Sequence, residues 1–325
     1  MHFLQNEFEQ VRRQGETNGN TVSVIEIPEI ENHKLGISEL ELPIFFIFCD
    51  SSDDIATVDY NLDLIKIEFS RNCVLTTSDT QRIEGVYTII SLKSDSLDIM
   101  QYFLDTVYLM LSNLPEKLTI NQLKNEVGKL VLLFNRLSEP AVKTIQGLWT
   151  ELLVIEQSVN PEYLIESWHI TPSDKYDFND GKDKVEVKST SKSKRVHTFS
   201  IEQLKPNSGS ELMIISVLVL QTGVGKSIVD LTNLIEKRVS NPRVRFELRK
   251  KIASCVGKDF EKALEIYFDY QYSIDSILFY KGENIPSINV ALVPPEISKI
   301  QFDCDLSNVP PFRKEFTSAL HKAII

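Results

Sequence analysis

WHITPSDKYDFNDGKDKVEVKSTSKSKRVHTFSIEQL, residues 168–204, is the stretch around which the chain is organised. It predicts a strand that ends at Asp177, a tight turn at Asn179 to Gly181, and a second strand that carries Glu186 and Lys188. Because side chains along a strand alternate between its two faces, Glu186 and Lys188 share a face. Carboxylate oxygens bind Mg²⁺, and a lysine beside a metal-activated water stabilises the charge that develops on a phosphate. The stretch therefore predicts a divalent-metal site suited to phosphate chemistry.

The order of Asp177, a hairpin and Glu186-x-Lys188 resembles the PD-(D/E)XK signature of the restriction-endonuclease-like nuclease superfamily. The wider pattern, from GLWTELLVI at residues 147–155 through VEVKST to Gln203, is similar to a family of restriction-like proteins found in bacterial defence gene clusters. The similarity covers roughly residues 140 to 235, and such short motifs depend on their structural context. It implies an α/β, restriction-endonuclease-like core, in which a mixed sheet is flanked by helices.

The resemblance also implies roles for particular residues. Asp177, Glu186 and the carbonyl of Val187 would bind Mg²⁺, and Mn²⁺ would substitute for it. Lys188 would orient or activate the attacking water and stabilise charge. Glu151, on the helix before the motif, would be a further ligand or would support the others. The implied activity is Mg²⁺-dependent hydrolysis of DNA.

Several of these residues have a simpler structural explanation. Glu151 interrupts an apolar helix expected from about Ala141 to Ser158, and it either binds metal or lies at the helix edge, exposed or paired with a lysine. Asp174 competes with Asp177 for the first acidic position, and we favour Asp177 because it lies closer to the turn. Ser200-x-x-Gln203 is a capping box, which explains Gln203 structurally, although related nucleases place a glutamine near the site. The VEVK segment alone would suit a solvated edge strand.

The distribution of charge along the sequence indicates how the protein would reach DNA. A net charge of −11 counts against a protein that binds DNA on its own. Two basic clusters oppose that balance, one from Lys182 to Lys205 and one from Arg243 to Lys251. Each is either a solvated face or a phosphate-contacting surface. This composition suits a nuclease that is brought to DNA by partner proteins.

Other features exclude some classes of protein. The longest apolar run, Leu212 to Leu220, is too short to span a bilayer, and no secretion signal opens the chain, so we expect a cytoplasmic protein without a membrane segment. The four cysteines lie far apart and are expected to be reduced. TGVGKS, residues 222–227, lacks the first glycine of a nucleotide-binding loop, because Leu220 stands there. The segment from Ser227 to Asp230 is instead a helix start.

The chain is expected to have four parts. These are a β-rich N-terminal domain (1–95), a helical connector (96–139), the nuclease-like core (140–235) and a helical then β C-terminal region (236–325). In the core we expect the order helix, strand, strand, strand, helix, strand. The third strand is Arg195 to Phe199, and a helix begins at Ser200. Beyond Leu231 the chain is expected to be helical to about Tyr270, in three segments, with Gly257 as a helix stop.

These observations lead to one preferred function and two rivals. The preferred function is a Mg²⁺-dependent DNA endonuclease of a bacterial restriction or anti-phage defence system, acting with an ATPase or other defence proteins. A homodimer is expected if both strands are cut, whereas nicking requires one site. The first rival is a catalytically inactive DNA-binding or scaffold subunit of a defence complex. The second is an RNA nuclease, which would use the same metal chemistry.

Overall fold

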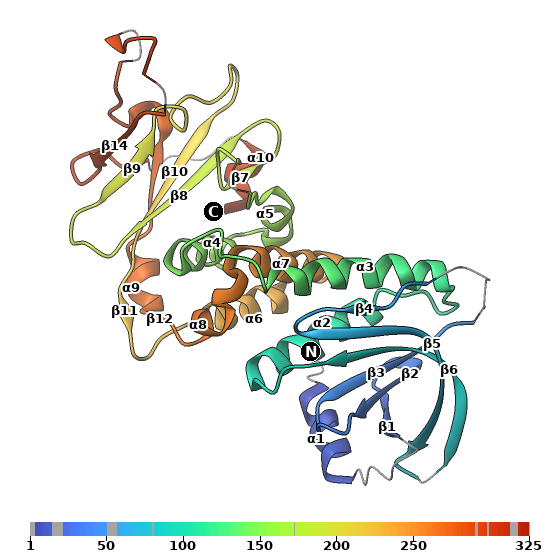
Figure 1. Ribbon diagram of the computed structural model, residues 1–325. Coiled ribbons are helices and arrows are strands. Elements are labelled where there is room, and N and C mark those ends of the chain that lie inside the picture. The colour runs from blue at the N-terminus through green and yellow to red at the C-terminus, as the bar shows by residue number, and fades with distance from the viewer. Residues whose placement is uncertain are drawn as a thin grey trace. The chain divides into compact units, whose positions relative to one another are not determined.

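The computed structural model describes residues 4–14, 22–50, 57–79, 81–171, 173–289, 292–297, 299–312 and 318–324 (Figure 1). The chain forms two compact units, Met1–Glu139 and Pro140–Ile325. Each unit has its own sheet and its own buried residues.

The first unit is built on a six-stranded sheet in the order β1-β2-β3-β6-β5-β4. All neighbouring strands in that order are antiparallel, and β1 also pairs with β5 in parallel, so five of the strands close into a ring. Closure leaves β1 and β5 without a free edge on that side. The strands are β1 (Val22–Ile27), β2 (Ile30–Ile37), β3 (Pro43–Phe48), β4 (Tyr60–Asn61), β5 (Ile65–Thr77) and β6 (Arg82–Leu92).

Among the described residues of this unit, three helices accompany the sheet: α1 (Leu4–Gln14), α2 (Leu97–Leu111) and α3 (Ile120–Arg136). The ring of Phe103 on α2 contacts Phe45 of β3 and Phe134 of α3, with centroid distances of 5.6 and 6.0 Å. All three rings are almost fully buried, so they join the sheet and the two helices into one core. Thr119 begins α3 with a complete capping box.

The second unit contains a four-stranded sheet in the order β13-β10-β8-β7. The central strands β8 and β10 are parallel, and β7 and β13 pair with them antiparallel. The sheet is therefore mixed, as expected for the core. Its strands are β7 (Phe178–Asn179), β8 (Lys184–Thr190), β10 (Leu212–Leu218) and β13 (Leu278–Lys281).

Helix α4 (Ile145–Gln157) packs against β8, and α5 (Pro161–Ser167) packs against β7 (Figure 1). Residues Leu148–Glu156 of α4 are all buried, in keeping with an apolar helix. The rest of the unit consists of α6 (Ile228–Arg238), α7 (Pro242–Val256), a 3-10 turn η1 (Gly257–Asp259), α8 (Phe260–Leu264), α9 (Tyr270–Asp275), a second 3-10 turn η2 (Gly282–Asn284) and α10 (Ala319–Ile324). Two further strand pairs are β9 (Val196–Ser200) with β14 (Gln301–Asp305), and β11 (Gln221–Thr222) with β12 (Tyr267–Phe268).

Because side chains alternate along a strand, the two faces of the central sheet pack against different elements. Glu186 of β8 pairs with Ile214 of β10 and shares its face. Ile214 belongs to a buried cluster that joins this face to the β9–β14 pair: Tyr176, Phe199, Leu212, Ile214, Tyr280, Ile285, Cys304 and Leu306. The opposite face carries Val187 and Ser189. Gln146 of α4 donates to the Ser189 hydroxyl over 3.1 Å, which places α4 on that face.

Four sequence-based expectations about these elements are wrong. No strand ends at Asp177, because β7 begins only at Phe178 and the residues before it form turns and loop. The strand β9 pairs with β14 instead of joining the central sheet. A turn follows Ser200 where a helix was expected, and β12 interrupts the helical region before residue 270. Two of these errors, those on β9 and β12, concern strand pairing between remote segments, which local sequence pattern does not specify.

The start of α4 also differs from the expectation. The Thr144 hydroxyl accepts a hydrogen bond from the Gly147 backbone N–H and so begins the helix at Ile145. Residues 141–143 precede the helix instead of forming its first turn. Lys143 therefore lies in a connecting segment, where its side chain can turn toward the carboxylates described below.

Candidate functional site

Asp177 lies directly before β7 and is held from two sides. Its Oδ2 accepts a hydrogen bond from the Val187 backbone N–H at 2.9 Å, and its Oδ1 lies 2.9 Å from the Lys143 ammonium. The competing residue Asp174 is elsewhere: it accepts a hydrogen bond from the Thr171 backbone N–H at 2.8 Å and lies 3.5 Å from His169. The structure thus brings Asp177, and not Asp174, to the middle of β8.

Glu151 is buried, with an exposed fraction of 4 %. Both of its carboxylate oxygens lie 2.5 Å from the Lys143 Nζ, and Oε2 also accepts a hydrogen bond from the Trp168 indole N–H at 2.6 Å. Of the alternatives for Glu151, pairing with a lysine is therefore present, but inside the protein rather than at a helix edge. A buried carboxylate with a cation and an indole donor is satisfied without solvent.

Lys143 is the site residue that sequence reasoning missed. Its ammonium bridges Glu151 and Asp177, which are 26 residues apart in the chain. No spacing rule connects a lysine before a helix with a carboxylate two turns into it. The only signal in the sequence was that an acidic residue inside an apolar helix requires a partner.

Glu186 and Lys188 form the second half of the site. The Lys188 Nζ lies 2.7 Å from the Glu186 carboxylate, so the two side chains share a face as the alternation predicts. The same carboxylate oxygen accepts a hydrogen bond from the Gln203 side-chain amide at 2.7 Å. Gln203 also exchanges the two hydrogen bonds of a capping box with Ser200, at 3.0 and 3.1 Å. The amide of Gln203 thus serves both the turn and Glu186.

The electrostatics of the cluster follow from burial. Burial, together with the nearby charge of Asp177, raises the pKa of Glu186 to about 8. Burial and Asp177 likewise raise the pKa of Glu151 well above its ordinary value. Burial opposes the charge on Lys143, but Asp177 and Glu151 outweigh it, and its pKa rises. Three carboxylates in a poorly solvated place therefore require cations, and two lysines supply them.

The donor chemistry suits a divalent metal, but the side chains surround an ammonium. Carboxylate oxygens are the ligands that Mg²⁺ and Mn²⁺ prefer. Within the described ranges, no group of three or more His, Cys, Asp or Glu side chains is arranged as a metal site. The geometry explains this, because Glu186 projects from the face of β8 opposite α4, while Lys143 lies between Glu151 and Asp177.

Part of the expected basic surface is internal. Arg195 donates to the Ser216 carbonyl and hydroxyl, Arg249 is buried against Glu236, and Lys251 donates to two backbone carbonyls, those of Ile165 and Trp168. These three side chains stabilise the unit and are not free to contact phosphate. In the first cluster, Lys182, Lys192, Lys194 and Lys205 are exposed. The phosphate-contacting alternative therefore applies only to exposed residues such as these four lysines and Arg243 of the second cluster.

Two further polar groups of the second unit have structural roles. His197 is buried, and its Nε2 lies 2.7 Å from the Ser216 hydroxyl. Burial lowers the pKa of His197 to about 4, which makes it a poor proton carrier near neutral pH. In TGVGKS, Ser227 and Asp230 form the capping box that begins α6, as expected from their spacing.

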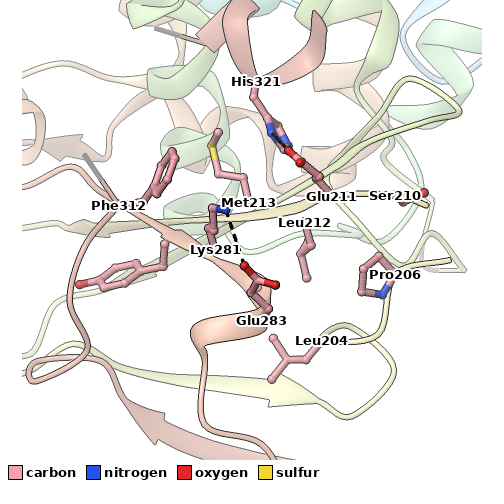
Figure 2. A pocket seen from close by; sticks show the side chains of 12 residues that line it. Leu204, Pro206, Ser210, Glu211, Leu212, Met213, Lys281, Glu283, Phe312 and His321 are labelled. Atoms are coloured by element: carbon pink, nitrogen blue, oxygen red, sulfur yellow. Dashed lines mark ion pairs between the residues drawn. The ribbon is translucent and has the colours of Figure 1, made fainter. Parts of the chain in front are cut away.

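A separate cavity of about 340 Å³ opens beside the start of β10 (Figure 2). Figure 2 shows Lys281 and Glu283 as an ion pair at its wall, and His321 beside Glu211. The charged groups of Lys281 and Glu283 lie 3.6 Å apart. The remaining lining is largely apolar. None of the lining residues belongs to the carboxylate cluster, so this cavity is distinct from the site around Glu186.

A helix-flanked mixed sheet that carries Asp177 before its edge strand and Glu186-x-Lys188 on a central strand defines a protein of the PD-(D/E)XK class. Residues 4–307 match the model of the family described as "Putative PD-(D/E)XK family member, (DUF4420)", and the chain belongs to this family. Comparison with curated proteins and with solved structures finds no match. The resemblance seen in residues 140–235 is confirmed, and the family relationship extends through the N-terminal unit. No helix in the described part of the chain is long and apolar enough to cross a membrane.

Proposed function

We propose that the chain is a divalent-metal-dependent nuclease that hydrolyses DNA. The observation that supports this most directly is the group of charged side chains around β8: the buried carboxylates of Glu151 and Glu186, the partly buried Asp177, and the lysines Lys143 and Lys188. Such a group is costly to bury and is rarely needed for stability alone. Its residue types are those of the family signature.

The roles of the side chains are those that the family resemblance implies. Asp177 and Glu186, with the Val187 carbonyl and Glu151, would hold Mg²⁺ or Mn²⁺. The ion would polarise a phosphate oxygen and lower the pKa of a bound water. Lys188, 2.7 Å from Glu186, would orient that water and stabilise charge. Gln203 would hold the Glu186 carboxylate in place through its amide.

The distribution of charge removes one objection to nucleic-acid binding. Residues 1–139 contain 22 Asp and Glu but only 11 Lys and Arg, whereas residues 140–325 contain 24 of each. The excess of negative charge therefore belongs entirely to the first unit. The unit that carries the proposed site is neutral, so its own exposed lysines can approach a phosphate backbone.

We place the activity in a cytoplasmic restriction or anti-phage defence system, in which an ATPase or other defence proteins bring the nuclease to DNA, and a homodimer cuts both strands. This wider setting rests on the family resemblance alone. RNA is the alternative substrate, because the same metal chemistry serves either sugar.

Plasmid nicking with Mg²⁺ tests the proposal. The variants Glu186→Ala, Lys188→Ala and Asp177→Asn should abolish cleavage, while their circular dichroism stays unchanged. Asp174→Asn is the matched control, because that carboxylate lies outside the cluster, and it should cleave normally. Parallel incubation with single-stranded DNA and RNA identifies the substrate. Undiminished cleavage by the first three variants would exclude these residues from catalysis.

The alternative function is a non-catalytic DNA-binding or scaffold subunit. One observation favours it: among the described residues the carboxylates surround a lysine instead of forming a ready metal site. Calorimetric titration with Mn²⁺ separates the two functions. A scaffold has no need to bind the ion through these carboxylates, so binding that Glu186→Ala abolishes favours the nuclease.

A further inference from the structure

Lys143 lies where the carboxylates need a cation and where a metal ion from solvent could enter. Its Nζ lies 2.5 Å from both oxygens of Glu151 and 2.9 Å from Asp177. Three carboxylate oxygens from two segments of the chain thus converge on one ammonium. Lys188, in contrast, is paired with Glu186 alone among these carboxylates. The two lysines therefore serve different parts of the cluster.

The backbone anchors Lys143 without restricting its side chain. The backbone N–H groups of Val142 and Lys143 both donate to the Cys255 carbonyl, at 2.9 and 3.3 Å. Lys143 precedes the capping residue Thr144, so its side chain is outside α4. The side chain is 18 % exposed, which leaves the ammonium a route toward solvent. A lysine on a flexible four-carbon stem can thus leave the carboxylates while the backbone and α4 stay in place.

The formal charges favour exchange of this ammonium for a divalent ion. Glu151 and Asp177 carry two negative charges when ionised, and Lys143 carries one positive charge between them. A divalent ion added beside Lys143 would leave an excess of positive charge in a poorly solvated place. Replacement of Lys143 by the ion gives a neutral group, and low solvation makes neutrality strongly favourable.

We propose that Lys143 is an internal competitor for the metal: it occupies Glu151 and Asp177 in the metal-free protein and is displaced when a divalent cation binds. The inference rests on the proposed function, because it assumes that these carboxylates bind metal. Lys143 is thus a regulatory cation that sets the metal concentration at which the site fills. Until the metal binds, the charge of Lys143 also compensates the negative charges of Glu151 and Asp177.

Calorimetric titration of the full-length protein with Mn²⁺ tests this competition. Lys143→Met keeps the aliphatic stem and removes the charge, so it should bind Mn²⁺ about tenfold more tightly than the wild type, or better. Lys143→Arg keeps a cation and should stay close to the wild-type affinity. Lys192→Met removes one exposed lysine and controls for net charge; it should change nothing. Unchanged or weaker binding by Lys143→Met would overturn the proposal.

Melting in EDTA is a second measurement that does not depend on activity. Lys143→Met leaves Glu151 and Asp177 without their cation, so it should melt below the wild type in EDTA and gain more on addition of Mn²⁺. If this variant does not fold, Lys143→Gln keeps a hydrogen-bond donor without charge and takes its place. Equal gains on Mn²⁺ addition for wild type and variant would contradict the competition.

The outcomes separate this inference from the proposed function. Cleavage and Mn²⁺ binding by the wild type, without tighter binding by Lys143→Met, would overturn the competition and keep the nuclease. Absence of Mn²⁺ binding in both proteins, together with absence of cleavage, would overturn both. Binding by Lys143→Met where the wild type binds weakly or not at all would support the competition directly.

Discussion

Glu186→Gln should change the pH dependence of stability in a defined direction. Burial and Asp177 raise the pKa of Glu186 from 4.5 to about 8 in the folded protein. Between these values the folded chain keeps a proton that the unfolded chain releases. A group of this kind stabilises the fold fully below pH 4.5 and loses that contribution as pH rises to about 8. Glutamine keeps the shape and the hydrogen-bonding oxygen but does not titrate, so the variant lacks this loss.

The size of the effect follows from the gap between the two pKa values. A difference of one between the folded and unfolded pKa values corresponds to about 1.4 kcal/mol. At pH 5 the wild type has lost less than about 1 kcal/mol of this stabilisation, and at pH 7 it has lost about 3 kcal/mol; both values are upper limits. The wild type should therefore lose about 2 kcal/mol relative to Glu186→Gln between pH 5 and pH 7.

Urea unfolding in EDTA, followed by tryptophan fluorescence, measures this difference. The two tryptophans, Trp149 and Trp168, both lie in the second unit, so the signal reports on that unit. Glu202→Gln is the matched control, because Glu202 is exposed and its variant should follow the wild type at every pH. A constant difference between wild type and Glu186→Gln from pH 5 to pH 7 would show that Glu186 is not protonated in the fold.

Two predictions concern stability away from the site. Arg249→Met leaves the fully buried Glu236 without its partner at 2.6 Å and should lower the free energy of unfolding by about 3–5 kcal/mol, whereas the double variant with Glu236→Leu should recover most of that loss. Urea unfolding compares the two variants. A small loss in the single variant would show that Glu236 does not need Arg249. Gly225→Ala would place a methyl group 2.3 Å from the Phe268 carbonyl oxygen and should cost about 1–3 kcal/mol, whereas Gly223→Ala meets nothing within 4 Å and should be neutral. Equal melting temperatures for the two glycine variants would contradict the close approach of β12.

The sequence by itself determined what depends on local pattern. Alternation along VEVKST placed Glu186 and Lys188 on one face, and the structure has them 2.7 Å apart. The apolar residues of 148–155 predicted a buried helix, and Ser227 predicted the start of α6. The order of Asp177, Glu186 and Lys188, together with the wider pattern from residue 147 to Gln203, carried the resemblance that the family match confirms.

Only the tertiary structure decided which distant groups meet. Lys143 reaches Glu151 and Asp177 because Thr144 begins α4 one residue later and leaves Lys143 outside the helix. Asp177 is chosen over Asp174 because the Val187 N–H of a neighbouring strand faces it. β9 does not join the central sheet but pairs with β14, which comes from a segment about a hundred residues later in the chain. Contacts between remote segments depend on packing and charge compensation in three dimensions, and the periodicity within one segment does not specify them.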